Sequence, residues 1–197
     1  MNDFWNERYG AEEFAYGVEA NSFVKQQLLK LKPGKILFPA EGEGRNAVYA
    51  ASLGWKVTAF DLSTEGRKKA IQLASKHNVA ISYLIDGYET VSFEKESFDC
   101  IVLVFAHIHS NKRTEYHQKL ASFLKPGGKL IMESFSKEQI FRDSGGPKSP
   151  EMLYSEEDMK KDFADFQELQ IEKTETQLRE GLYHIGPASV IRVVATK

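Results

Sequence analysis

The stretch from Lys35 to Ser63 constrains the fold of this chain more than any other. It begins with a short apolar run and passes through a turn that contains Gly42 and Gly44. An alanine-rich helical pattern follows, and a second apolar run ends at Asp61. A strand, a glycine turn, a helix and a second strand in this order are typical of the βαβ unit of a parallel sheet. We therefore expect the rest of the chain to extend such a sheet.

The alternation of strand and helix patterns continues up to Phe135. Further strands are expected over 80–85, 98–105 and 129–135, with helices over 64–77 and 112–124. The run over 98–105 is almost continuously apolar, which is typical of a central strand buried on both faces. Beyond an insert over 136–150 and a capped helix that begins after Ser155, two long alternating runs meet at Glu180-Gly181 and predict a hairpin.

These patterns predict an α/β fold. We expect a doubly wound, Rossmann-like mixed sheet of seven strands, with helices on both faces and an antiparallel hairpin at the C-terminal end. A chain of 197 residues with 42% hydrophobic content suits a single domain. We expect that domain to span 1–197.

Composition narrows the possible partners and the compartment. The formal net charge of −2 gives no global reason to bind nucleic acid or an anionic membrane. Cys100 is the single cysteine, which excludes an internal disulfide, and no Cys/His cluster has the spacing of a zinc site. The N-terminal residues lack the pattern of a signal peptide, and no apolar run approaches the ~18 residues of a spanning helix. We expect a cytoplasmic protein with no metal, nucleic-acid or membrane partner.

The glycine turn predicts a nucleoside pocket. Without side chains at Gly42 and Gly44, the backbone can approach a ligand closely, and Asp61 is placed to accept hydrogen bonds from ribose hydroxyls. The segment from Gly42 to Ala47 also fits the G-x-G-x-x-A form of a dinucleotide fingerprint. An NAD(P)-dependent oxidoreductase is therefore an alternative.

Three other features favour S-adenosylmethionine as the ligand. Asp86-Gly87 ends the third strand, where a carboxylate can accept from an adenine amino group. A Lys-Pro-Gly-Gly turn leads into the fifth strand, and the chain closes with a hairpin instead of another βαβ unit.

The aromatic segment over 4–16 has two interpretations. It forms either a flap over the ligand, with Trp5 and Tyr16 as walls and Arg8 as an anion contact, or a plug for one face of the core.

Several motifs together carry a family resemblance. They are Phe-Trp-Asn-Glu-Arg-Tyr at 4–9, Glu-Gly-Glu-Gly-Arg-Asn-Ala at 41–47, Phe-Asp-Leu-Ser at 60–63, Phe-Ala-His-Ile at 105–108, Leu-Lys-Pro-Gly-Gly at 124–128, Gly-Gly-Pro-Lys at 145–148 and Glu-Gly-Leu-Tyr-His-Ile-Gly at 180–186. With them the chain resembles the class I S-adenosylmethionine-dependent methyltransferases. More narrowly, it resembles their tellurite-resistance branch, which is related to thiopurine methyltransferase.

The resemblance implies a cofactor site and a division of the domain. It implies an N-terminal flap and helix over 1–34, a cofactor-binding core over 35–135, and a substrate-side insert with the terminal hairpin over 136–197. The turn from Glu41 to Gly44 would lie under the methionine part, Asp61 would hold the ribose, Leu62 would flank the adenine, and the stretch from Phe105 to His107 would line the pocket beside the sulfonium. The cofactor-binding residues predicted in this way are Ala40, Glu41, Gly42, Gly44, Asn46, Asp61, Leu62, Asp86, Gly87, Phe105 and Ala106.

One departure from the family pattern concerns the first acid of the glycine motif. The family has Asp-x-Gly where this chain has Phe38-Pro39-Ala40. Phe38 cannot replace a carboxylate that orders the loop, so either cofactor affinity is weakened or Glu41 compensates. The altered turn also leaves open a third class, a cofactor-binding protein without methyl-transfer activity.

Methyl transfer requires alignment of the acceptor, the methyl carbon and the sulfur, and exclusion of water. A base is needed only for a hydroxyl or ammonium acceptor. His107 is the candidate base, and the alternative is that it only holds the neighbouring loop. Gly146 and His184 are candidates for a substrate lid, with ordinary loop and strand surface as the alternatives. The expected acceptor is a small molecule, such as a thiol or a tellurium or selenium compound.

Overall fold

The computed structural model describes residues 2–197 and contains two compact units. The first unit comprises the described residues up to Ser92 together with Glu180–Tyr183, and the second comprises Phe93–Arg179 and His184–Lys197. The single domain expected from the sequence stays a prediction.

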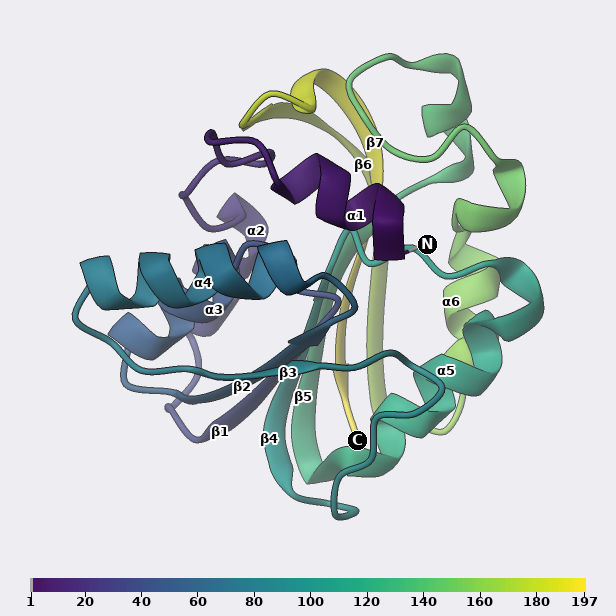
Figure 1. Ribbon diagram of the computed structural model, residues 1–197. Helices are drawn as coiled ribbons and strands as arrows, with labels where there is room; N and C mark the ends of the chain where they lie inside the picture. Colours follow the sequence, from purple (N-terminus) through teal and green to yellow (C-terminus); the bar gives the residue numbers. More distant parts are fainter. Residues whose placement is uncertain (1) are drawn as a thin grey trace. The chain divides into compact units, whose positions relative to one another are not determined.

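The first unit contains three parallel strands and four helices. Strand β1 pairs with β2 and β2 pairs with β3, all in parallel, as expected from the sequence. Ser63 caps α4 by accepting from the Gly66 amide at 3.0 Å, and Asn21 caps α2 in the same way. The elements, visible in Figure 1, are α1 (Asn2–Tyr9), α2 (Ser22–Leu28), β1 (Lys35–Pro39), α3 (Arg45–Ser52), β2 (Lys56–Asp61), α4 (Thr64–Lys76) and β3 (Ser82–Ile85).

The second unit contains four strands, two α-helices and two short 3₁₀ helices. Strand β4 pairs with β5 in parallel, whereas β5 pairs with β7 in the antiparallel direction. The elements are β4 (Phe98–Val104), α5 (Ser110–Phe123), β5 (Leu124–Phe135), η1 (Lys137–Phe141), η2 (Pro150–Met152), α6 (Glu156–Asp162), β6 (Glu168–Glu180) and β7 (His184–Thr196).

The strand order of the sheet is β3-β2-β1-β4-β5-β7-β6. This order confirms the seven-stranded mixed sheet, with β7 and β6 as its C-terminal hairpin. Two details differ from the sequence-based expectation. Residues 2–9 form helix α1, and β5 begins at Leu124, so that the Lys-Pro-Gly-Gly motif lies within the strand. Main-chain hydrogen bonds between Lys197 and both Gly127 and Gly128 hold this early part of β5.

Residues 2–197 contain neither a membrane-spanning helix nor a cluster of metal-binding side chains. Each helix in this range is too short or too polar to cross a membrane. The same residues contain no group of three or more His, Cys, Asp or Glu side chains that could hold a metal ion. Cys100 is buried in β4, and burial raises the pKa of its thiol, so the thiol stays protonated at neutral pH.

Candidate functional site

Three carboxylates follow the carboxyl ends of the parallel strands in the first unit. Glu41 follows β1, Asp61 ends β2, and Asp86 follows β3. The Glu41 amide donates to the Phe60 carbonyl at 3.2 Å, and the Asp86 amide donates to the Asp61 carbonyl at 3.1 Å. These main-chain contacts hold the three acidic residues at one edge of the parallel sheet, which is where ligands bind in open α/β sheets.

Glu41 is buried against the first turn of α3. One of its oxygens, Oε1, accepts hydrogen bonds from the amides of Asn46 at 2.9 Å and Ala47 at 2.8 Å. Burial raises the pKa of this carboxyl to about 7, and the two amides and Arg45 oppose the rise. The side chain therefore occupies the position at a helix N-terminus where a phosphate group could otherwise bind.

Asp61 joins the glycine turn to the start of α4. Its Oδ2 accepts from the Gly42 amide at 3.0 Å, and its Oδ1 accepts from the Ser63 amide at 2.9 Å. Burial raises the pKa of the Asp61 carboxyl, while the amide hydrogen bonds act in the opposite direction. Each carboxylate oxygen can accept a second hydrogen bond, so these contacts leave acceptor capacity for ribose hydroxyls.

The glycine turn is shaped by close packing within the protein. Gly42 has φ 63° and Gly44 has φ 86°. A Cβ at Gly42 would lie 2.6 Å from Tyr9 Oη, and one at Gly44 would lie 2.5 Å from Ala70 Cβ. The sequence suggested room for a ligand at both glycines, whereas the structure also places protein atoms against them.

Ala40 stands where the family pattern has glycine. Its φ of 49° lies in the left-handed region, which disfavours residues with a Cβ. The Phe38 side chain, in place of the family's acid, is completely buried in β1.

Asp86, Gly87 and Leu62 lie together beside the ends of β2 and β3. Asp86 Oδ1 accepts from the Gly87 amide at 2.8 Å and from the Thr90 hydroxyl. A Cβ at Gly87 would lie 3.0 Å from Leu62 Cδ2. The missing side chain at Gly87 thus makes room for Leu62, and the roles of these residues toward an adenine ring stay predictions.

Helix α1 packs onto the glycine turn and the start of α4. The rings of Trp5 and Tyr9 stack at 5.4 Å, and Tyr9 meets Tyr16 edge to face at 6.4 Å. Asn6 Oδ1 accepts from the Ser63 hydroxyl at 2.8 Å. Tyr9 is buried, as expected of a plug, while Trp5, Arg8 and Tyr16 are half-buried. The segment therefore combines features of both interpretations, and its role as a flap stays a prediction.

Arg45 and Asn46, at the start of α3, are held by neighbouring protein groups. Arg45 forms an ion pair with Glu180 at 2.8 Å, and both side chains are largely buried. Asn46 Oδ1 accepts from the Asn21 amide at 2.9 Å, and Asn21 Nδ2 donates to Glu180 Oε1 at 3.1 Å. These contacts use the Asn46 carbonyl oxygen and leave its cofactor role a prediction.

In the second unit, four predicted site residues gather around Phe135. The Phe105 ring stacks on Phe135 at 4.5 Å and meets His184 at 4.6 Å. His107 stacks on Phe135 at 5.5 Å, and a Cβ on Gly146 would lie 2.6 Å from the Phe135 ring. We call Phe105, His107, Phe135, Gly146 and His184 the aromatic cluster. Phe105 has φ 49°, a strained conformation of the kind found at functional sites.

His107 is neutral at physiological pH and both its ring nitrogens have partners. Its Nδ1 lies 2.6 Å from the Met152 carbonyl oxygen, and its Nε2 accepts from the Phe135 amide at 3.3 Å. Burial lowers its pKa to about 4. This geometry matches the alternative in which His107 holds the neighbouring loop, and it leaves no lone pair for a base in this conformation. The catalytic role of His107 stays a prediction that the geometry disfavours.

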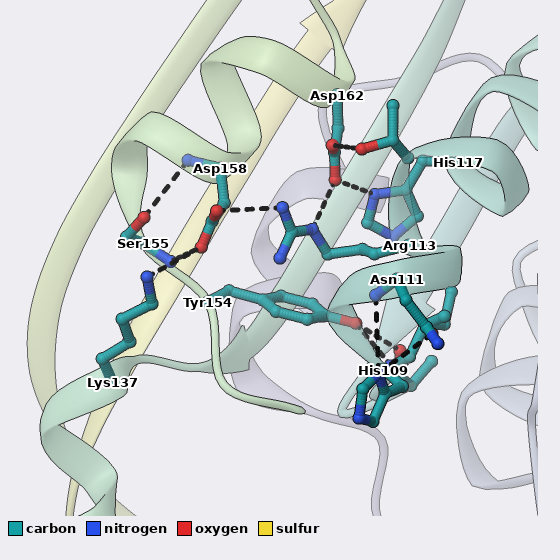
Figure 2. A network of polar contacts seen from close by, with 12 residues as sticks. His109, Asn111, Arg113, His117, Lys137, Tyr154, Ser155, Asp158 and Asp162 are labelled. Carbon is teal, nitrogen blue, oxygen red and sulfur yellow. Dashed lines mark hydrogen bonds and ion pairs between the residues drawn. The ribbon is translucent and has the colours of Figure 1, made fainter. Parts of the chain in front are cut away.

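A polar network that the sequence did not suggest supports the loop beyond β4. Tyr154 Oη accepts from the Ile108 amide at 2.7 Å and donates to the Ala106 carbonyl at 3.3 Å. Figure 2 shows Arg113 between Asp158 and Asp162, with contacts of 2.9 and 2.7 Å. Asp162 also bonds to His117 Nδ1 at 2.9 Å and to the Thr114 hydroxyl at 2.6 Å. The basic Arg113 in one predicted helix and the acidic Asp158 and Asp162 in another were the signal in the sequence that could have suggested this network.

Part of the chain is similar to known methyltransferase sequences. Residues 36–128 match the family model described as "Methyltransferase domain". Over 110 residues the chain is 31% identical to the ubiquinone biosynthesis O-methyltransferase of Xanthomonas euvesicatoria pv. vesicatoria. The matched segment covers 55% of this chain and 46% of that protein, so the chain spans less than half the length of the curated relative.

Solved structures match over most of the chain. TehB from Haemophilus influenzae superposes with a TM-score of 0.74 at 18% identity, over 100% of this chain and 66% of that chain. A SAM dependent methyltransferase from Aquifex aeolicus superposes with a TM-score of 0.62 at 21% identity, over 88% of each chain. The chain has the α/β methyltransferase fold. The matching domain model and the Aquifex neighbour, which is described as SAM dependent, support S-adenosylmethionine as the cofactor.

Proposed function

We propose that the protein transfers a methyl group from S-adenosylmethionine to a small-molecule acceptor. The observation that carries this proposal is the edge formed by Glu41, Asp61 and Asp86. S-adenosylmethionine carries a sulfonium, an ammonium, two ribose hydroxyls and an adenine amino group. Acidic side chains at adjacent strand ends suit such a cationic, donor-rich molecule.

The same edge argues against the NAD(P)-dependent alternative. A dinucleotide brings a pyrophosphate, which in such folds binds at the N-terminus of the first helix. In this chain Glu41 already accepts from the α3 amides. Burial is the largest cause of the raised pKa values of Tyr9 and Tyr83, and the charges of Asp61, Glu41 and Glu43 raise these pKa values further. The carboxyl groups gathered at this turn therefore disfavour the binding of an anionic pyrophosphate.

The residues of the first unit fit the cofactor in a defined way. Asp61 retains acceptor capacity beside Gly42, and Asp86 with Leu62 would hold the adenine ring. Glu41 would favour the cationic methionine end while it keeps α3 in place. The bound cofactor would supply a methyl group on a sulfonium with a neutral leaving group. The task of the chain's own residues is then to orient the reactants and to exclude water.

The environment of His107 indicates the chemistry of the methyl acceptor. His107 offers no free lone pair, which favours an acceptor that needs no base at that position, such as a thiolate or a selenium or tellurium anion. The tellurite-resistance branch suggested by the motifs agrees with such an acceptor. The curated relative is named an O-methyltransferase of ubiquinone biosynthesis, so a hydroxyl acceptor is the second candidate. We place the reaction in the cytoplasm.

Isothermal titration calorimetry tests the cofactor. We expect S-adenosylhomocysteine to bind and NADH to give no heat of binding. Asp61→Asn, which preserves size, should weaken S-adenosylhomocysteine binding by about 1.5–3 kcal/mol, because a hydrogen bond to a charged group is lost. Asp143→Asn, a change at an exposed residue of the second unit, is the matched control and should leave the affinity unchanged.

Two results would contradict the proposal. Heat from NADH with none from S-adenosylhomocysteine would replace it with the oxidoreductase. Normal binding of S-adenosylhomocysteine without methyl transfer to any thiol, selenide, tellurite or catechol acceptor would support a cofactor-binding protein that lacks the activity.

A further inference from the structure

We infer that Arg8 binds an anionic group of the acceptor, and that the acceptor is a planar molecule carrying a carboxylate or a similar oxyanion. This inference rests on the proposed function and specifies its substrate class. The contacts of Arg8 that support it all lie within the first unit.

The Arg8 guanidinium is held in a fixed orientation by aromatic residues. It lies 3.7 Å from the centroid of the Tyr183 ring and 5.1 Å from that of Phe4. Its NH1 group donates to Tyr16 Oη at 3.3 Å. Stacking and a hydroxyl acceptor together restrict the plane of the guanidinium, so little side-chain entropy remains to be lost when a ligand binds.

The charge of Arg8 has no ion-pair partner among residues 2–197. This distinguishes it from the two most buried ion pairs of the same unit, which join Arg45 to Glu180 and Lys69 to Glu43. A guanidinium has five N–H donors, and the Tyr16 hydroxyl uses one direction of the fork. The remaining donors suit bidentate binding of a carboxylate or another oxyanion.

Two partly exposed aromatic rings lie beside Arg8. Phe4 is 52% exposed and Tyr183 is 43% exposed. Exposed aromatic rings flanking a cation match the chemistry of a planar ligand that combines an apolar face with an anionic edge.

Arg8 also lies next to the predicted cofactor turn. It directly precedes Tyr9, whose hydroxyl is the atom that a Cβ on Gly42 would meet. The turn carries Glu41 and Glu43 and contacts Asp61, and this concentration of carboxyl groups would repel an anion. The distribution of charge therefore orients the acceptor, with its anionic end at α1 and its nucleophile directed away from that end.

Two matched probes test the inference by direct binding. 4-Mercaptobenzoate and 4-mercaptobenzamide have nearly the same shape and differ in charge, and 3,4-dihydroxybenzoate with 3,4-dihydroxybenzamide repeats the comparison for a hydroxyl acceptor. Each is titrated calorimetrically into the full chain saturated with S-adenosylhomocysteine. In at least one pair we expect the carboxylate to bind at least tenfold more tightly than the amide. Arg8→Met should weaken carboxylate binding roughly 10- to 100-fold and amide binding less than twofold.

Controls separate this inference from the proposed function. Arg67→Met removes a guanidinium of the same unit whose Nε donates to the Tyr83 carbonyl, and it should not change the preference for the carboxylate. S-adenosylhomocysteine should bind Arg8→Met as it binds the unchanged chain, which also shows that the variant is folded. If S-adenosylhomocysteine did not bind the unchanged chain, the proposed function would be refuted instead.

Three outcomes would overturn the inference while the cofactor site remains intact. They are equal binding of carboxylate and amide, an unaffected carboxylate affinity in Arg8→Met, and no binding of any of the four probes. Arg8-dependent sedimentation with phosphatidylglycerol vesicles, in the absence of selectivity between the probes, would assign this surface to a membrane and would equally refute an acceptor site.

Discussion

At the scale of single residues, Glu41 is the clearest case of a side chain whose environment sets its chemistry. Its carboxyl is buried, yet one oxygen accepts from two main-chain amides at the start of α3. Burial outweighs these bonds and raises the pKa from 4.5 to about 7. The ionised form is therefore less favourable in the folded protein than in the unfolded chain.

The raised pKa predicts a specific dependence of stability on pH. Glu41 binds its proton more tightly in the folded state than in the unfolded chain. The stability that this binding provides is therefore fully present below pH 4.5 and is lost as the pH rises to about 7. Glu41→Gln keeps an acceptor oxygen for the α3 amides and removes the titration. The unfolding free energy of the variant minus that of the unchanged protein should therefore increase by about 3 kcal/mol from pH 4.5 to pH 8.

Urea denaturation at both pH values measures this difference. Glu172→Gln, at an exposed position of β6, is the control and should show a much smaller change. If the stability difference between Glu41→Gln and the unchanged protein were the same at both pH values, the raised pKa would be wrong.

Individual site residues were predictable where a main-chain position determines them. Asp61 and Asp86 follow from the ends of apolar runs, and the structure holds both at the same sheet edge. The contacts of Glu41 and His107 were not predictable, because they depend on side-chain direction and on partners such as Met152 that lie 45 residues away. Sequence spacing carries no information about either.

At the scale of elements, Tyr154 connects the segment before α6 to the loop after β4. Its hydroxyl satisfies the Ile108 amide and the Ala106 carbonyl, and its ring lies 5.4 Å from the Arg113 guanidinium. Arg113 in turn joins α5 to α6 through Asp158 and Asp162. The Tyr154 side chain thus links the loop that carries Ala106 and His107 to the network that joins α5 and α6.

Tyr154→Phe should destabilise the protein by about 2 kcal/mol. The ring still fills the core, but the Ile108 amide and the Ala106 carbonyl lose their buried partner. The free energy of unfolding in urea measures the loss. Tyr49→Phe, at a half-buried position in α3, should change stability by less than about 0.5 kcal/mol. Equal effects of the two substitutions would show that Tyr154 does not support the loop.

Most elements were predictable from local patterns, because apolar runs and helix caps act over a few residues. The Ser155 cap is present as expected, and Ser63 caps α4 in a similar way. Helix α1 was not predicted, since its aromatic and charged residues lack a helical apolar face and its position depends on Asn6 binding near Ser63. The early start of β5 depends on Lys197, far along the chain.

At the scale of the whole molecule, the first unit is completed by residues from near the end of the chain. Glu180 accepts from Arg45 and Asn21, and the Leu182 amide donates to the Ala15 carbonyl at 2.9 Å. A Cβ at Gly181 would lie only 2.4 Å from main-chain atoms of Ala15 and Gly17. Gly181, at φ 62°, is therefore required for this close main-chain contact.

Glu180→Gln should destabilise the first unit by about 3 kcal/mol. The amide retains the bond from Asn21 but leaves the buried Arg45 guanidinium without its counter-charge. Hydrogen exchange of the amides around Ala15 and Leu182, with urea denaturation, measures the effect. Glu175→Gln breaks an exposed ion pair with Arg142 and should cost less than about 1 kcal/mol. A similar cost for both would mean that the Arg45–Glu180 pair does not stabilise the unit.

The contact between Arg45 and Glu180 also has a consequence for biosynthesis. The two residues are 135 positions apart, which at 5–20 residues per second corresponds to roughly 7–27 s of translation. Once β3 has been synthesised, the nascent first unit contains all three of its parallel strands but still lacks the carboxylate that neutralises Arg45. The contacts of residues 180–183 with this unit form only after these residues leave the ribosome, so a unit built mainly from residues up to Ser92 depends for its completion on a segment that is synthesised much later.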